Sequence, residues 1–128
     1  MSRTNDLRQL VQSMLKASDF MKKYGIKEVY HKKADDEKMY PHIVYTIKSI
    51  NLEDSSRKDY IITVDIYTKD EKEVNNIADD VEDMFNNINS PNDTILPTFF
   101  LSGRNGVPDE DKNIQHEVVK IQIQLYER

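Results

Sequence analysis

The chain has 128 residues, which fits one domain over residues 1–128, and it has no cysteine, which excludes disulfides, thiolate nucleophiles and cysteine-ligated zinc. Its net charge of −5, from 23 acidic and 18 basic residues, gives no global support to non-specific binding of nucleic acid. The first residues, MSRTNDLRQL, lack the apolar core of an export signal, and no run approaches the ~18 apolar residues of a membrane span. We therefore expect neither export nor membrane insertion.

Two short helices are predicted at the N-terminus. The first runs from Asn5 to Leu15, because apolar residues recur there at helical spacing. The second lies in SDFMKKYG, where Ser18 or Asp19 can cap the start and Gly25 can take the left-handed closing position.

Extended segments follow. KEVYH (27–31) is a brief strand candidate, and HIVYTIKSI (42–50) and DYIITVDIYT (59–68) alternate apolar and polar residues at the strand period of two. The last two predict an antiparallel hairpin with a long polar tip. Ile62, Val64 and Ile66 then face the core, and Asp65 and Tyr67 face the other way.

From Asp70 the apolar period changes from 2 to 3.6. The helix predicted there is the clearest element of the chain, and its apolar stripe is Val74, Ile77, Ala78, Val81, Phe85 and Ile88. ILPTFFL (95–101) follows as a strand candidate in which Pro97 is confined to an edge or to a strand start. Residues 102–113 are then a turn-rich loop, and EVVKIQIQLYE (117–127) is an amphipathic strand. This order predicts an α+β fold, with two or three helices packed on a mainly antiparallel sheet of about four strands.

The stretch VDIYTKDEKE (64–73) concentrates carboxylates where strand gives way to helix. A hard cation would need them to converge, but Asp65 lies on the face away from the core. A nuclease of the Asp…Glu-x-Lys type would need Glu71 and Lys72 on a strand, whereas both fall in a helical turn. Asp70 and Glu73 fit a capping box before the helix, so we interpret the stretch as structural.

Other chemistry also lacks its usual parts. The histidines His31, His42 and His116 are dispersed and show no metal-binding spacing. With three glycines in all, no phosphate-binding loop is evident, and no serine stands in a nucleophile elbow. We therefore predict a non-enzymatic protein with no catalytic residues, metal or cofactor.

Three segments carry a resemblance to a known family. Pro41-His42-Ile43-Val44-Tyr45, then Val64-Asp65-Ile66-Tyr67 and the helix from Glu73 to Phe85, resemble the tail-completion, or tail-to-head joining, proteins of long-tailed bacteriophages and prophages. The N-terminal helix and the C-terminal strand are consistent in place and length. The charged segment from Lys32 to Lys38 and the few glycines depart from the family pattern.

The resemblance implies a structural virion protein that forms a ring, expected to be a hexamer, at the head-tail interface after assembly in the host cytoplasm. Its implied partners are other copies of itself, the tail-tube protein, head or neck connector proteins, and DNA that passes through the lumen without specific binding. An acidic lumen lined by Asp79, Asp80 and Asp83 would let phosphates slide without sticking. The candidate assembly residues are the exposed tips and the open sheet face, namely Asp54, Arg57, Asp65, Tyr67, Arg104, Asn105, Asp109 and Asp111.

Two other functions fit the same sequence. One is a head-closure or neck connector protein of the same assembly. The other, from a different class, is a small cytosolic metal-dependent hydrolase or binding module. The hydrolase predicts that calcium, magnesium or manganese raises the melting temperature.

Overall fold

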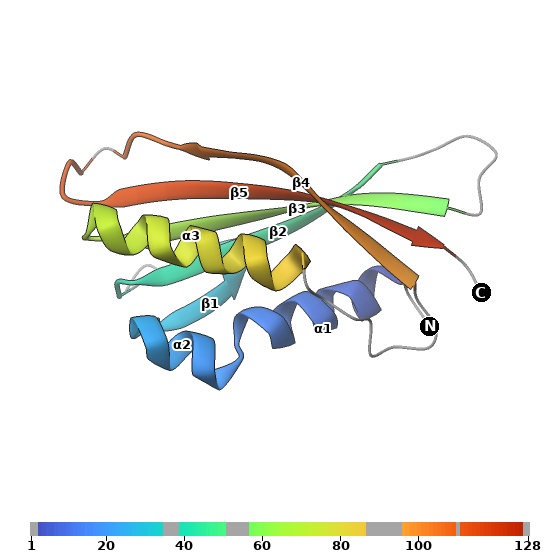
Figure 1. Ribbon diagram of the computed structural model, residues 1–128, viewed down its shortest axis with the longest axis horizontal. Coiled ribbons are helices and arrows are strands. Elements are labelled where there is room, and N and C mark those ends of the chain that lie inside the picture. Colours follow the sequence, from blue (N-terminus) through green and yellow to red (C-terminus); the bar gives the residue numbers. More distant parts are fainter. Residues whose placement is uncertain (1–2, 35–38, 51–56, 87–95, 110, 127–128) are drawn as a thin grey trace.

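The computed structural model of the chain describes residues 3–34, 39–50, 57–86, 96–109 and 111–126, and the following concerns those residues. Their helices are α1 (Arg3–Leu15), α2 (Ser18–Tyr24) and α3 (Glu71–Asn86). Their strands are β1 (Glu28–His31), β2 (His42–Ile50), β3 (Arg57–Thr68), β4 (Leu96–Gly106) and β5 (Gln115–Tyr126). Figure 1 shows the helices against the sheet.

The strands form one five-stranded sheet in the order β1-β2-β3-β5-β4. Every neighbouring pair is antiparallel except β1 and β2, which are parallel. The predicted α+β class and the mainly antiparallel sheet are therefore confirmed, with five strands rather than about four. The 42–50 and 59–68 segments pair as the expected hairpin.

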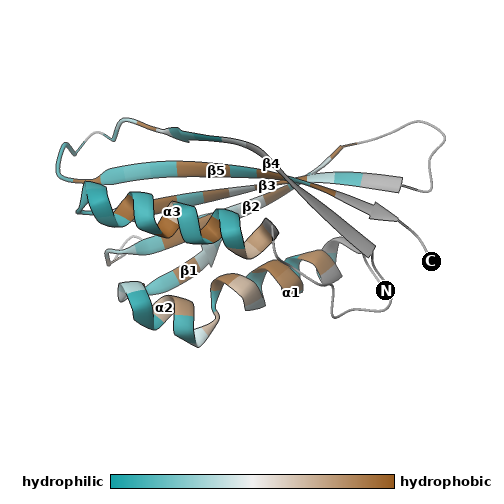
Figure 2. Cartoon of the chain, viewed as in Figure 1, coloured by the Kyte–Doolittle hydropathy of each residue, from teal (hydrophilic) through white to brown (hydrophobic). Residues whose placement is uncertain are grey.

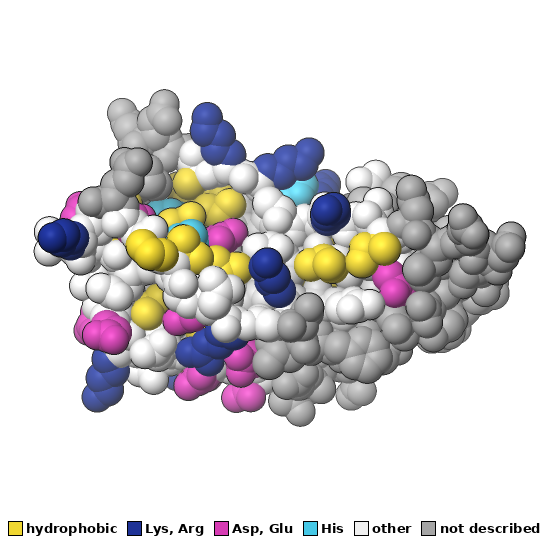
Figure 3. Space-filling model, turned by 90° about the horizontal axis from the view of Figure 1, so that it is seen from above, with side chains coloured by type: hydrophobic (Ala, Val, Ile, Leu, Met, Phe, Trp, Pro, Cys, Tyr) yellow, Lys and Arg dark blue, Asp and Glu magenta, His cyan; other side chains and the backbone are white. Residues whose placement is uncertain are grey.

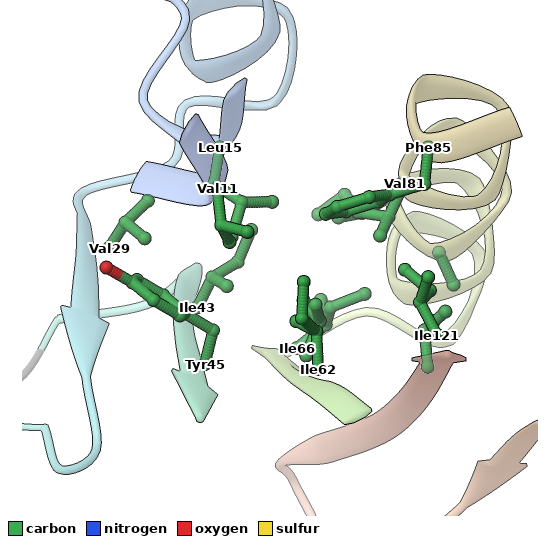
Figure 4. Close-up of a cluster of buried hydrophobic side chains, with 14 of the residues drawn as sticks. Val11, Leu15, Val29, Ile43, Tyr45, Ile62, Ile66, Val81, Phe85 and Ile121 are labelled. Carbon is green, nitrogen blue, oxygen red and sulfur yellow. The ribbon is translucent and has the colours of Figure 1, made fainter. Parts of the chain in front are cut away.

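The core lies between the helices and one face of the sheet. Figure 4 shows Val11 and Leu15 of α1 near Val29, Ile43 and Tyr45, and Val81 and Phe85 of α3 near Ile62, Ile66 and Ile121. Ile62, Val64 and Ile66 are fully buried, as their alternation predicts. This core is continuous from Leu7 to Ile123, so elements from both ends of the chain share it.

Local chemistry explains where the helices begin and end. Gly25 closes α2 with φ 64°, the left-handed conformation predicted for it, but Ala17 rather than Ser18 or Asp19 occupies the N-cap. At α3 the Oδ1 of Asp70 accepts the Lys72 N–H at 2.9 Å, as a cap should. Figure 2 shows hydrophilic residues alternating with hydrophobic ones along α3, as the helical stripe requires.

The β4 strand corrects the sequence interpretation of residues 102–113. It runs on through Gly106 instead of ending near Leu101, so Arg104 and Asn105 belong to a strand and not to a loop. A register shift between Leu101 and Gly103 inserts an extra residue in β4. Because a bulge reverses the alternation of faces, it turns Arg104 toward the helices, where Val119 is its cross-strand neighbour.

Candidate functional site: an aromatic patch on the open face of the sheet

Three rings lie side by side across the sheet on the face away from the helices. Tyr67, near the end of β3, has His42 of β2 as its cross-strand neighbour on one side and His116 of β5 on the other. Directly opposed side chains lie within contact range in antiparallel pairs. The register therefore builds one stack from residues distant in sequence.

The geometry of this stack is close and nearly parallel. The ring centroids of His42 and Tyr67 are 4.8 Å apart with planes inclined by 11°, and those of Tyr67 and His116 are 4.1 Å apart at 20°. Tyr40 extends the row, with its centroid 4.9 Å from that of His42. Aromatic pairs of this kind contribute roughly 0.5 to 1.5 kcal/mol beyond the area they bury. We call Tyr40, His42, Asp65, Tyr67 and His116 the aromatic patch.

Hydrogen bonds fix both histidines. His116 donates from Nε2 to Asp65 Oδ1 at 2.8 Å, with the two side chains 13% and 21% exposed. His42 is buried, and its Nδ1 donates to the Met39 carbonyl oxygen at 3.1 Å. These bonds restrict ring rotation, so the patch is a rigid surface and not a set of mobile side chains.

The tyrosines keep their protons at neutral pH. Burial, followed by the charges of Asp65 and Asp109, raises the pKa of Tyr67 above its ordinary value. Burial also raises the pKa of Tyr40, with Asp109 and Asp111 adding to the shift. Asp109 therefore lies near enough to act on both hydroxyl groups, and the loop that carries Asp109 and Asp111 borders the aromatic patch.

Asp109 and Asp111 also shape their own loop. The Asp111 N–H donates to Asp109 Oδ1 at 2.9 Å, and the Asn113 N–H donates to Asp111 Oδ1 at 2.9 Å. Such turns hold a short segment in place without regular structure. A groove of about 440 Å³ lies between this loop and the first turn of α3, and it is lined in part by Asp109, Asp111 and His116.

The structure thus gathers only some of the predicted assembly residues. Asp65 and Tyr67 lie in the aromatic patch, with Asp109 and Asp111 at its border. Asn105 is exposed on β4 opposite Val118, on the same face of the sheet. Asp54 lies outside the described residues, and Arg57 begins β3 with a side chain that is likewise outside the description.

Arg104 departs from its predicted role as a loop-tip residue. Its side chain lies against α3, with Nη1 at 2.5 Å from Asp79 Oδ1 and at 3.4 Å from Glu82 Oε1. Nε lies 3.9 Å from Glu117 Oε1. Burial opposes the charge of Arg104, but the hydrogen bonds and charges of Asp79 and Glu82 outweigh it and raise its pKa. Arg104 therefore ties β4 to α3.

The acidic stretch that precedes α3 separates into two parts. Asp65 faces away from the core as predicted, but it is partly enclosed and bound to His116. The predicted capping box is wrong in one half, since the Asp70 N–H donates to Thr68 Oγ1 at 3.2 Å and not to Glu73. Among the side chains that the structure describes, no group of three or more His, Cys, Asp or Glu is arranged to hold a metal ion.

His42 and His116 are the site residues that sequence reasoning missed. They are distant along the chain, and only the strand register places them on either side of Tyr67. A signal was available: alternation puts His42 on the face opposite Ile43 and His116 on the face opposite Glu117. What the alternation could not supply was the pairing of β5 with β3.

What the aromatic patch can do is bind. It offers the partly exposed rings of Tyr40, Tyr67 and His116 beside carboxylates, a combination that suits lysine or arginine side chains of another molecule. The chain already contains one such contact, since Lys69 Nζ lies 5.5 Å from the Tyr40 ring centroid. In the view of Figure 3, histidine side chains lie among hydrophobic ones toward one end of the molecule.

Comparison with known proteins adds no family. No family model matches the chain, and no curated protein matches it at a significant level. Within the described ranges, none of the helices has both the length and the apolar character needed to cross a membrane.

Proposed function

We propose that the chain is a structural virion protein that completes a phage tail and joins it to the head as a ring at the head-tail interface. The observation that carries this proposal is the pairing of the two strand segments that resemble the tail-completion family. His42 lies opposite Tyr67, Val44 opposite Asp65, and Tyr45 opposite Val64. Two separate sequence likenesses therefore form one two-stranded unit, as expected if they belong to one shared element.

The chemistry of the aromatic patch supports the proposal. Tyr67 and Asp65 project from that unit onto the open face, and the histidines on either side hold them rigid. Preorganised aromatic side chains lose little conformational entropy on binding, which suits a contact between proteins. The proposed partners are further copies of the chain, the tail-tube protein and a connector protein, and DNA passes through without specific binding. The proposal needs no cofactor and no catalytic step.

Deletion of the gene from a phage or inducible prophage that encodes this chain tests the proposal. The expected result by electron microscopy is DNA-filled heads and separate tails, with joined particles restored when the wild-type chain is supplied. Tyr67→Ala should fail to restore joining even though the variant folds. Normal particles from the deletion strain would overturn the proposal.

Binding assays separate the rival functions. The purified chain should bind polymerised tail-tube protein encoded in the same genome. Binding to the portal adaptor alone would favour a head-closure or neck protein instead. A rise in melting temperature of several degrees in magnesium or manganese would favour the metal-dependent hydrolase.

A further inference from the structure

A basic groove lies beside α1, at the β1 edge of the sheet. It has a volume of about 440 Å³ and is lined by Arg8, Gln9, Gln12, Ser13, Lys16 and His31. Arg8 and Gln12 of α1 and Lys16, the residue after its end, are spaced four residues apart; since the Lys16 N–H still donates to the Gln12 carbonyl at 2.9 Å, the three form one row. We call this set the basic groove.

Packing fixes the floor of the basic groove. His31 stacks on Tyr45, with ring centroids 5.0 Å apart and planes inclined by 27°, and the Tyr45 hydroxyl donates to Gln12. Burial, followed by the positive charges of Arg8 and Lys32, lowers the pKa of His31. The positive charges of Arg8 and Lys32 thus add to the effect of burial on His31.

The carboxylate of Glu28 partly neutralises the positive charge of the basic groove. Glu28 Oε1 lies 3.1 Å from Lys16 Nζ, with both side chains well exposed, which makes the pair a weak one. Arg8 and Lys32 add further positive charge near His31. The basic groove therefore suits an acidic surface better than a neutral one.

The matching acidic surface is on α3. This helix contains six acidic residues and one lysine, a formal charge of −5 that equals the net charge of the whole chain. The exposed residues Asn76, Asp79 and Asp83 follow one another at helical spacing, and we call these three the acidic row; Lys72, one turn earlier on α3, is exposed as well. Asp79 remains 62% exposed even though it contacts Arg104.

The two surfaces lie toward opposite edges of the sheet. The basic groove includes His31 of β1, the strand at one edge, whereas α3 is held by Arg104 of β4, the strand at the other. One flank of α3 also contacts α2, where Lys23 Nζ lies 2.8 Å from Asp80 Oδ2. Two unlike surfaces on different sides of one chain can meet only between copies, and repetition of such a contact produces a ring or a filament.

We propose that the basic groove receives the acidic row of a second copy of this chain, and that this head-to-tail contact builds the ring. The ring rests on the proposed function, whereas the contact itself does not require it. The proposal gives the carboxylates of α3 a use that differs from the acidic lumen expected from the sequence, because a surface buried between subunits cannot line a channel.

Site-specific cross-linking tests the contact, since a chain without cysteine reacts only where cysteine is introduced. Gln9→Cys marks the basic groove and Asn76→Cys marks the acidic row, and both substitutions leave every charge in place. A bismaleimide linker should join an equimolar mixture of the two variants into dimers at low salt. A chain that carries both cysteines should give a ladder of dimers, trimers and larger species.

Charge reversal supplies the specific control. Arg8→Glu in the Gln9→Cys chain should lower the yield of mixed dimer at least tenfold, and Asp79→Lys in the Asn76→Cys chain should restore much of it. High salt should weaken the wild-type contact because exposed charges are screened. As a matched control, Gln9→Cys mixed with Thr46→Cys, on the open face, sets the background.

Three results would overturn the contact. They are mixed dimers no more abundant than this background, dimers formed equally well by either single variant alone, and a yield unaffected by Arg8→Glu. If cross-linking succeeds while the deletion strain makes normal particles, the self-contact stands and the proposed function fails. If cross-linking fails while joining requires the chain, the function stands and this contact is wrong.

Discussion

The two faces of β3 differ in what they contact: one packs in the core, and the other contributes to the aromatic patch. Toward the helices, Ile62, Val64 and Ile66 are fully buried in the core. Toward the open face, Asp65 and Tyr67 are half-buried and held by His116 and His42. Because neighbouring residues of a strand point to opposite faces, each face can change without direct loss of contacts on the other. Stability should therefore depend mainly on one face, and the proposed partner binding through the aromatic patch on the other.

The largest effect on stability should come from the covered face. Ile62→Ala removes a fully buried side chain and should lower the free energy of unfolding by about 2 to 5 kcal/mol. Thr63→Ala, one residue along on the open face, should change it by about 0.5 kcal/mol or less. Urea unfolding of the two variants measures this difference. Equal losses would show that both faces are packed alike.

The open face should show the reverse pattern. Asp65→Asn weakens the contact with His116 and should lower the free energy of unfolding by about 0.5 to 1.5 kcal/mol, while head-tail joining is lost. Joining is scored by counting infectious particles after complementation of the deletion strain.

His116→Gln, and the variant that carries both Asp65→Asn and His116→Gln, complete a double-mutant cycle that measures the coupling between Asp65 and His116. Because Asp65 and His116 touch, their separate effects should not add. If the Asp65→Asn variant restores head-tail joining fully, the open face of the sheet has no role in assembly.

The sequence predicts the buried residues of the covered face better than the contacts of the open face. The apolar alternation of β3 and the helical stripe of α3 directly predict burial, which Ile66 and Phe85 bear out. The partners of Tyr67 depend on which strands pair and in what register, and a single sequence does not encode that locally. The turn of Arg104 toward α3 depends on a bulge beside Gly103, which shifts the alternation by one residue, and the same glycine fits the turn-rich loop that the sequence predicted there.

Loss of the contact between Arg104 and α3 should have a smaller effect on the free energy of unfolding than loss of a core side chain. Arg104→Gln should lower the free energy of unfolding by about 0.3 to 1 kcal/mol, because its partner Asp79 is well exposed. Arg104→Glu should cost more, since it places a fourth carboxylate beside Asp79, Glu82 and Glu117. Thermal unfolding of Arg104→Gln and Arg104→Glu shows which of the two variants is less stable. If the two substitutions are equal, Arg104 acts by packing and not by charge.

The smallest effect concerns pH and the edge of the covered face. His31 has a lowered pKa in the folded chain, by burial first and then by Arg8 and Lys32. The unfolded chain, whose histidine titrates near ~6.5, therefore binds more protons as the pH falls below that value. His31 thus contributes stability that is present above about pH 6.5 and is lost as the pH falls through its folded pKa.

His31→Phe keeps a ring over Tyr45 but does not titrate. Between pH 7 and pH 5, its free energy of unfolding should fall less than that of the wild type in urea titrations. Lys32→Gln should also reduce this fall in the free energy of unfolding, but by less, because it removes one of the two positive charges that disfavour protonation of His31. His42 and His116, on the open face, remain in both variants and cancel in the comparison with wild type. Parallel curves for wild type and His31→Phe would mean that the basic groove does not act on His31, and would weaken the electrostatic basis of the contact between copies.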